Sequence, residues 1–328
     1  MKRLHDMEGA SIPSCCALLG YSKQAYYKQH SSHEQCVLQE GLILQEVCAI
    51  RKEMPVLGVR KLYHLLRVRL PPGVLPGRDA FFALLGENGL LVRRRKRASP
   101  VTTISWHHFH KYPNLYKGYT PLCANMVWVA DITYIRLSDG SFLYLSLLTD
   151  AYSHKIVGWH LSDSLSLEGA LHALNQALGE LPRDHSLIHH SDRGVQYCSN
   201  AYTAMLKANG IQISMTENGD PRENAVAERL NGILKDEWIN REEIVSLEYG
   251  RERIQEIVDI YNKKRPHMSN GYMTPEKAHW QQGKLKRQWK TYYKKKENFN
   301  TIIEECVSLP EESLVDRGGT TPVNQGQE

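Results

Sequence analysis

The sequence predicts an α/β protein in which a mixed β-sheet core follows all-α units near the N-terminus. Residues 1–92 have the apolar spacing and the capping signals of helices. From residue 127 onward, the patterns run strand, strand, strand, helix, strand, helix, strand, helix. Strands joined by short turns pair antiparallel and strands joined by helices pair parallel, so the sheet should contain both arrangements.

Length and composition are those of an ordinary soluble protein. A chain of 328 residues can form a large core and two or three domains. The net charge is only +5, so any case for a nucleic-acid partner rests on where the charges lie. No apolar stretch reaches the ~18 residues of a membrane span. The seven cysteines are scattered without a CxxC pair, which favours a reduced, cytoplasmic protein.

Residues 1–50 form the first predicted segment. The run from Ser11 to Tyr27 predicts a helix, a turn at Gly20 and a second helix capped by Ser22. A helix-turn-helix and a plain helical hairpin both fit this pattern. We interpret the segment as helix-turn-helix-like.

Residues 51–97 form a second predicted unit of the same kind. Helical spacing runs from Gly58 to Leu66, and another helix, beginning at Arg78, ends at the Asn88-Gly89 C-cap signal. Five basic residues follow directly: Arg93, Arg94, Arg95, Lys96 and Arg97. Such a run is often a solvated surface, but beside a helix-turn-helix-like unit we predict that it contacts DNA phosphates.

Residues 98–124 are predicted to be a linker, because prolines recur along them. His107, His108 and His110 raise the question of a zinc site. No paired cysteines accompany them, so a polar linker is the favoured interpretation.

The core is predicted element by element from residue 125 to residue 280. Alternating or continuous apolar runs predict strands, and apolar residues three and four apart predict helices. The expected elements are strands at 127–136, 142–148, 155–161, 186–190 and 211–215, a hairpin turn at 138–141, and helices from 166 and over 199–209.

A further helix is predicted to begin at Asp220, with Pro221 in its first position. At about 100° per residue, its apolar residues fall on one stripe, whereas Glu228 and Lys235 fall together on the opposite face. An exposed Glu and Lys are by themselves ordinary surface residues. Because they follow Asp131 and Asp192 in the pattern described next, we interpret Glu228 and Lys235 as candidate site residues.

Three acids form a pattern typical of metal-dependent phosphoryl transfer. Asp131 lies inside an apolar strand-like run, where a carboxylate is costly to bury without a positive partner such as a metal ion. Asp192 follows a second short apolar run, and 35 residues separate it from Glu228. Lys235 lies two helical turns beyond Glu228.

Several short motifs occur in a fixed order around these acids. They are Trp128-x-x-Asp131-Ile-Thr-Tyr134, Asp150-x-x-Ser153, Ile156-Val-Gly-Trp159, His190-Ser-Asp192-Arg-Gly194, Asn224-Ala-Val-Ala-Glu228, Tyr261-Asn262 and Arg265-Pro-His267. The series resembles the D-D-35-E core of retroviral integrases and bacterial transposases, and the resemblance spans roughly residues 50 to 280. It is most similar to the second-reading-frame (OrfB) transposases of the IS-three group of insertion sequences.

The resemblance implies a ribonuclease-H-like catalytic core that cleaves DNA 3′ ends and transfers strands. Asp131, Asp192 and Glu228 would be the catalytic residues and would hold two Mg²⁺ ions, with Asp131 between them and Mn²⁺ able to substitute. The predicted DNA-binding residues near this site are Lys235, Arg193, Arg222 and Asn231. The resemblance implies no other cofactor.

The resemblance also implies partners. The chain would act on insertion-sequence ends and target DNA in the cytoplasm, associated with the nucleoid and without a membrane, as a homo-oligomer on DNA. Whether it acts alone, with an upstream OrfA product or as a frameshift fusion stays open. Two alternatives are an inactive DNA-binding repressor of its own element and a nuclease that does not join strands. Residues 281–328 are predicted to be a basic helix and a disordered tail.

Overall fold

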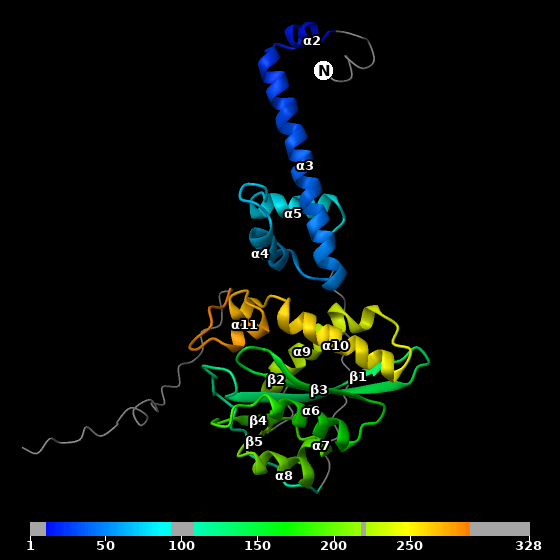
Figure 1. The fold of residues 1–328 in the computed structure, drawn as a ribbon, viewed down its shortest axis with the longest axis vertical. Coiled ribbons are helices and arrows are strands. Elements are labelled where there is room, and N and C mark those ends of the chain that lie inside the picture. The colour runs from blue at the N-terminus through cyan, green and yellow to red at the C-terminus, as the bar shows by residue number, and fades with distance from the viewer. Residues whose placement is uncertain (1–10, 93–107, 218–220, 289–328) are drawn as a thin grey trace, which may run out of the picture. The chain divides into compact units, whose positions relative to one another are not determined.

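The structure is a computed structural model that describes residues 11–92, 108–217 and 221–288 (Figure 1). The chain divides into two compact units, residues 1–289 and 290–328, and the second unit lies outside the described ranges. Most of the predicted C-terminal basic helix and tail, and the basic run at 93–97, also lie outside them. No helix within the described ranges has both the length and the apolar character needed to cross a membrane.

The N-terminal part is helical, as predicted. Its helices are α2 (Ile12–Leu18), α3 (Lys23–Glu53), α4 (Val59–Arg69) and α5 (Arg78–Glu87). Ser11 and Ser22 cap the first two through their hydroxyls, and Gly20 turns the chain between them with φ of 73°. Helix α3 continues across residue 50, where the sequence suggested a boundary between two units, and the domain boundaries stay predictions.

The core contains the predicted mixed sheet. Its strands are β1 (Val127–Arg136), β2 (Phe142–Asp150), β3 (Ile156–Ser162), β4 (Ile188–Ser191) and β5 (Gln212–Met215), in the order β3-β2-β1-β4-β5. The first three strands pair antiparallel, whereas β4 pairs parallel with both β1 and β5. The hairpin between β1 and β2 turns at Gly140, whose φ is 92°.

Helices cover both faces of the sheet (Figure 1). One face carries α6 (Leu167–Gly179), α7 (Val195–Cys198) and α8 (Asn200–Ala208). The other carries α9 (Ala225–Glu237) and α10 (Leu247–Lys263). The remaining short helices are η1 (Pro221–Asn224), η2 (Ile239–Arg241), η3 (Met268–Asn270) and α11 (Pro275–His279).

The helical stretch that carries Glu228 begins at Pro221 as predicted, but its first turn is a 3-10 turn and not part of the α-helix. Asp220 lies outside the described residues, the chain after it forms the 3-10 turn η1, and α9 begins only at Ala225. Two side chains of the 3-10 turn are held by partners outside it. Asn224 donates to the carbonyl of Ala130 on β1 at 3.0 Å, and the Glu223 carboxylate accepts from the Glu217 backbone N–H at 2.6 Å.

The N-terminal helices share a hydrophobic core with one face of the sheet. Buried residues of α3, α4 and α5 belong to the same cluster as buried residues of β2, α9 and α10. Polar contacts cross this junction too, since Trp238 donates its indole N–H to the Glu53 carbonyl at 2.7 Å. The His64 and Tyr272 rings stack with centroids 4.5 Å apart.

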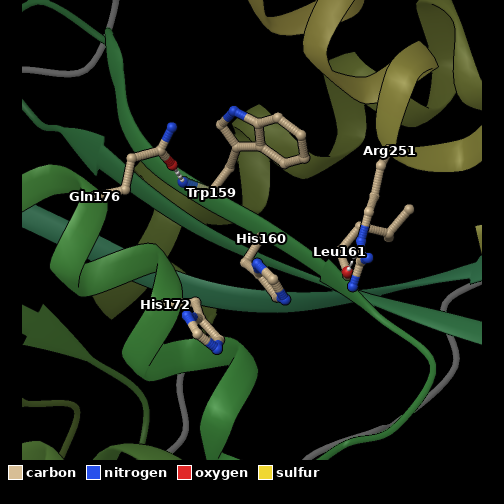
Figure 2. A pocket seen from close by; sticks show the side chains of 6 residues that line it. All are labelled: Trp159, His160, Leu161, His172, Gln176 and Arg251. Carbon is tan, nitrogen blue, oxygen red and sulfur yellow. Dashed lines mark hydrogen bonds between the residues drawn. The ribbon is translucent and has the colours of Figure 1, made fainter. Parts of the chain in front are cut away.

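Strand β3 is an edge of the sheet, and side chains occupy part of its outer backbone (Figure 2). Gln176 on α6 accepts the Trp159 backbone N–H at 2.8 Å, and Arg251 on α10 donates to the Leu161 carbonyl at 3.1 Å. An open strand edge invites pairing with another chain, so these contacts protect it. Together with His160 and His172, these side chains line a shallow groove.

Candidate active site

Asp131 and Asp192 lie side by side because their strands are neighbours. Strands β1 and β4 run parallel, and their last paired residues are Val129 and His190. Asp131 and Asp192 each follow two residues later, and therefore on the same face of the sheet. Neighbouring strands are about 4.8 Å apart, so the topology brings the two carboxylates together.

The Asp131 carboxylate is half-buried and accepts two hydrogen bonds. One oxygen accepts the Ile132 backbone N–H at 3.0 Å, and the other accepts the side-chain amide of Asn231 at 2.6 Å. Burial raises the pKa of Asp131 to about 7, with a further contribution from the charge of Asp192 and a smaller one from Glu228. The two hydrogen bonds act in the opposite direction. The site therefore carries concentrated negative charge.

Asp192 is held by the turn that follows β4. One of its carboxylate oxygens accepts the Gly194 backbone N–H at 2.9 Å. A Cβ on Gly194 would lie 3.0 Å from that oxygen, so the glycine permits the close approach of backbone and carboxylate. This explains the glycine in the His190-Ser-Asp192-Arg-Gly194 motif.

Helix α9 brings Glu228, Asn231 and Lys235 to Asp131. Glu228 is exposed and lies close enough to raise the pKa of Asp131. Lys235 is half-buried; burial lowers its pKa, and the charge of Asp131 partly opposes that effect. The shared face predicted for Glu228 and Lys235 is thus present and faces Asp131. Asn231 was expected only as a DNA contact, although its place three residues after Glu228 puts it on the same side of the helix.

The donor set suits a hard divalent cation. Asp131 and Asp192 offer carboxylate oxygens, which Mg²⁺ prefers, and their mutual repulsion would be relieved by a cation. Within the described ranges, however, no three His, Cys, Asp or Glu side chains are already gathered closely enough to form a metal-binding set. Glu228 is the outlying member, since its effect on Asp131 is smaller than that of Asp192.

The other predicted DNA contacts are only partly covered by the structure. Arg193 follows Asp192 directly and is half-buried. Burial raises the pKa of the nearby Cys198 thiol to about 11, and the charge of Arg193 opposes this effect only slightly. The side chain of Arg222 and all five basic residues at 93–97 lie outside the described parts of the chain.

Neighbouring polar residues have structural partners. His190 engages both ring nitrogens, with the Ser214 hydroxyl at 2.8 Å and the Glu223 carbonyl at 3.0 Å. Asp150 is fully buried and accepts the backbone N–H and the hydroxyl of Ser153, each at 2.7 Å. Both side chains are therefore held by hydrogen bonds within the fold. The groove of Figure 2 lies at the β3 edge and is not part of this site.

Comparison with known proteins points to one family. An integrase core domain model matches residues 121–221, and a second integrase core domain model matches residues 209–275. Among solved structures, the HTLV-2 integrase catalytic core domain in complex with magnesium aligns with a TM-score of 0.40 and 18% identity. That alignment covers 49% of this chain and 99% of the viral one.

Two bacterial relatives are similar along most of their own length. The 31 kDa protein of insertion element IS600 from Shigella sonnei is 33% identical over 270 residues, which cover 79% of this chain and 95% of the relative. The transposase InsF for insertion sequence IS3A from Escherichia coli K12 is 33% identical over 199 residues, covering 59% and 67%. With its mixed sheet, adjacent acids and integrase core domain, the chain belongs to the transposases of the IS3 group and carries their ribonuclease-H-like, integrase-like core.

Proposed function

We propose that this transposase cleaves the 3′ ends of its element and joins them to target DNA, using Asp131, Asp192 and Glu228 as catalytic residues. The observation that carries the proposal is the pairing of Asp131 and Asp192 at neighbouring parallel strands, where each raises the negative charge around the other. Such a charge-rich pair is unfavourable without cations, and a phosphodiester resists attack for the same electrostatic reason. Divalent cations would offset both the repulsion between the two carboxylates and the negative charge of the phosphodiester.

The three carboxylates would hold two Mg²⁺ ions, with Mn²⁺ as a substitute. When bound, such ions activate the attacking water or 3′-hydroxyl and stabilise the leaving oxygen. Among the protein groups, Asn231 positions Asp131 by holding one of its oxygens at 2.6 Å. The amide thereby keeps the carboxylate in one orientation while the other oxygen stays bound to the Ile132 backbone N–H.

Cationic side chains would hold the DNA. Lys235 cannot ligate a metal ion, so the partner we propose for it beside Asp131 is a DNA phosphate. Arg193 and Arg222 would contact the same strand near the site. The basic run Arg93–Arg97 would hold phosphates further along the DNA, as the continuation of a DNA-binding unit over residues 51–97.

Assembly follows from the reaction. Joining two ends of one element to a target requires both ends to be held together, so we propose that the protein acts as a homo-oligomer on DNA. An OrfA product, separate or fused by frameshifting, would contribute to the recognition of the ends.

The test incubates the full-length protein with labelled element ends, target DNA and Mg²⁺, and follows cleavage and joining. Asp131→Asn, Asp192→Asn and Glu228→Gln should each abolish cleavage and joining. Each replaces a negatively charged carboxylate, a proposed metal ligand, by a neutral amide of nearly the same volume. DNA binding in EDTA should persist in all three. Asp163→Asn is the matched control, because it neutralises an exposed carboxylate beyond strand β3.

The outcomes separate the candidate functions. Parent-like joining by any of the three variants removes that residue from the catalytic set. DNA binding by the parent without cleavage or joining indicates the repressor alternative. Cleavage without joining indicates a nuclease.

A further inference from the structure

The side chain of Asn224, in the turn η1 that leads into α9, is tied to strand β1. Backbone pairing between β1 and β4 ends at Val129 and His190. The next carbonyl of β1, that of Ala130, accepts the Asn224 side-chain amide at 3.0 Å. Asn224 is 5% exposed, so this contact is shielded from water. It ties the start of α9 to the residue directly before Asp131.

The preceding residue of the same turn is tied to strand β4. The Glu223 carbonyl lies 3.0 Å from Nε2 of His190, and because a carbonyl oxygen only accepts, Nε2 is the donor. The other ring nitrogen contacts the Ser214 hydroxyl at 2.8 Å, and that hydroxyl accepts the Leu115 backbone N–H at 2.9 Å. His190 is fully buried and lies two residues before Asp192. The turn is therefore fixed beside the second acid as well.

Glu228 is the acid whose position depends on this turn. The sheet places Asp131 and Asp192, whereas Glu228 lies on α9, about one helical turn after Asn224. Ala227 packs with buried residues of β1 and β4, but apolar contact is non-directional and does not by itself fix the register of the helix. Hydrogen bonds have preferred directions, so the two contacts of η1 fix where α9 begins.

Asn224 does not have the role that is usual at its position. It is the N-cap residue of α9, where an asparagine oxygen commonly accepts an N–H of the first turn, yet it makes no such cap hydrogen bond. Its Oδ1 is buried and has no hydrogen-bond partner in the described parts of the chain. Both features cost stability, so the fold alone does not account for an asparagine directed at Ala130.

We propose that Asn224 and His190 are positioning residues that hold Glu228 in register with the two aspartates, so that all three carboxylates can bind the same pair of divalent cations. Neither residue ligates a metal ion itself; each acts by fixing where α9 begins. The inference rests on the proposed function, since it takes Glu228 as a metal ligand.

The experiment titrates metal-free, full-length protein with Mn²⁺ alone in a calorimeter, without DNA. Asn224→Ala should weaken Mn²⁺ binding about 10–100-fold, the usual loss when a residue that orients a metal ligand is removed. Asn262→Ala is the matched control, because Asn262 is 6% exposed and its amide donates to the Ile156 carbonyl at 3.0 Å. This control should lower the Tm in EDTA and leave the Mn²⁺ affinity unchanged.

Two variants of His190 separate its two contacts. A glutamine amide reaches the place of the imidazole Nε2, so His190→Gln can keep the donor to the Glu223 carbonyl. An asparagine is shorter, so His190→Asn can keep only the contact with Ser214. His190→Gln should therefore retain most of the Mn²⁺ affinity, whereas His190→Asn should lose as much as Asn224→Ala. The reverse order would remove His190 from the proposal.

The Glu228→Gln background tests whether Asn224 acts through Glu228. Glu228→Gln by itself should weaken Mn²⁺ binding. Adding Asn224→Ala should then cause little further loss, because the ligand that Asn224 positions is already gone. A further loss as large as that of Asn224→Ala alone would show that the two residues act independently, and the inference would be refuted.

The remaining outcomes distinguish this inference from the proposed function. If Glu228→Gln weakens Mn²⁺ binding while a folded Asn224→Ala keeps the parent affinity, the positioning role is refuted and the proposed function stands. If Glu228→Gln keeps the parent affinity, Glu228 is not a metal ligand and both proposals fall. If Asn224→Ala has no folding transition in EDTA, the order of the two His190 variants decides the inference.

Discussion

The effect of Asp131→Asn on the free energy of unfolding should change sign with pH. The variant should be more stable than the parent at high pH and less stable at low pH. Because the folded-state pKa of Asp131 is raised from 3.8 to about 7, the folded protein holds a proton that the unfolded chain releases. The stability that the protonated Asp131 allows is fully present below about pH 4, and it is lost as the pH rises through 7 and the buried carboxyl becomes charged. At 1.36 kcal/mol per pKa unit, the charged form costs at most about 4 kcal/mol above pH 8. This is an upper bound, because part of the pKa shift comes from the charge of Asp192, and two interacting carboxyl groups titrate as a pair.

The Asn side chain removes that cost but also loses an acceptor. Asp131 accepts from both Ile132 and Asn231, whereas an amide offers one carbonyl oxygen. Leaving one donor unpaired costs about 1–3 kcal/mol. In metal-free buffer the variant should therefore be about 1–3 kcal/mol more stable than the parent above pH 8, after subtracting this loss from the charge cost. Near pH 4, where the parent is protonated, it should be less stable by the same range.

The assay is urea unfolding in EDTA at about pH 4, 6 and 8, repeated with Mg²⁺. Mg²⁺ should stabilise the parent at pH 8 much more than Asp131→Asn, because a ligand that binds only the folded state stabilises it. Asp163→Asn is the control and should show no pH-dependent difference. A variant that is less stable than the parent by one constant amount at every pH would refute the reasoning, since burial would then impose no charge penalty.

Three further changes test other parts of the structure. A Cβ on Gly158 would lie 2.2 Å from the Ala173 carbonyl, so Gly158→Ala should lower the unfolding free energy by about 1–3 kcal/mol in urea melts. Arg265 is buried and donates two hydrogen bonds to Glu237, at 2.6 and 2.8 Å. Glu237→Gln leaves this arginine without its counter-charge and should cost about 3–5 kcal/mol; a loss below about 1 kcal/mol would show that water reaches the pair. Lys235→Ala should weaken binding of element ends and slow joining with an unchanged Mg²⁺ requirement, whereas Lys235→Arg should retain much of both. Parent-like joining by Lys235→Ala at limiting DNA would make it an ordinary surface residue.

The sequence by itself determined the elements whose signals are local. Strand β1 has the predicted bounds, residues 127–136, because its apolar run ends at a turn containing Gly140. Helix α9 buries Leu230, Ile233 and Leu234 as its spacing predicts, and so presents Glu228 and Lys235 together. Asp131 was identifiable because a carboxylate within an apolar strand needs a compensating partner.

Only the tertiary structure decided the features that depend on distant partners. Asn224 is 94 residues from the β1 carbonyl that accepts its amide, so no local pattern could reveal this contact at the start of α9. Asn231 is 100 residues from Asp131, so no local pattern could reveal that its amide orients the carboxylate. Arg265, in the segment after α10, likewise finds its acid partner 28 residues away, at Glu237 on α9. Periodicity reports which side of an element is apolar, whereas the partner of each polar side chain is decided only when the elements pack.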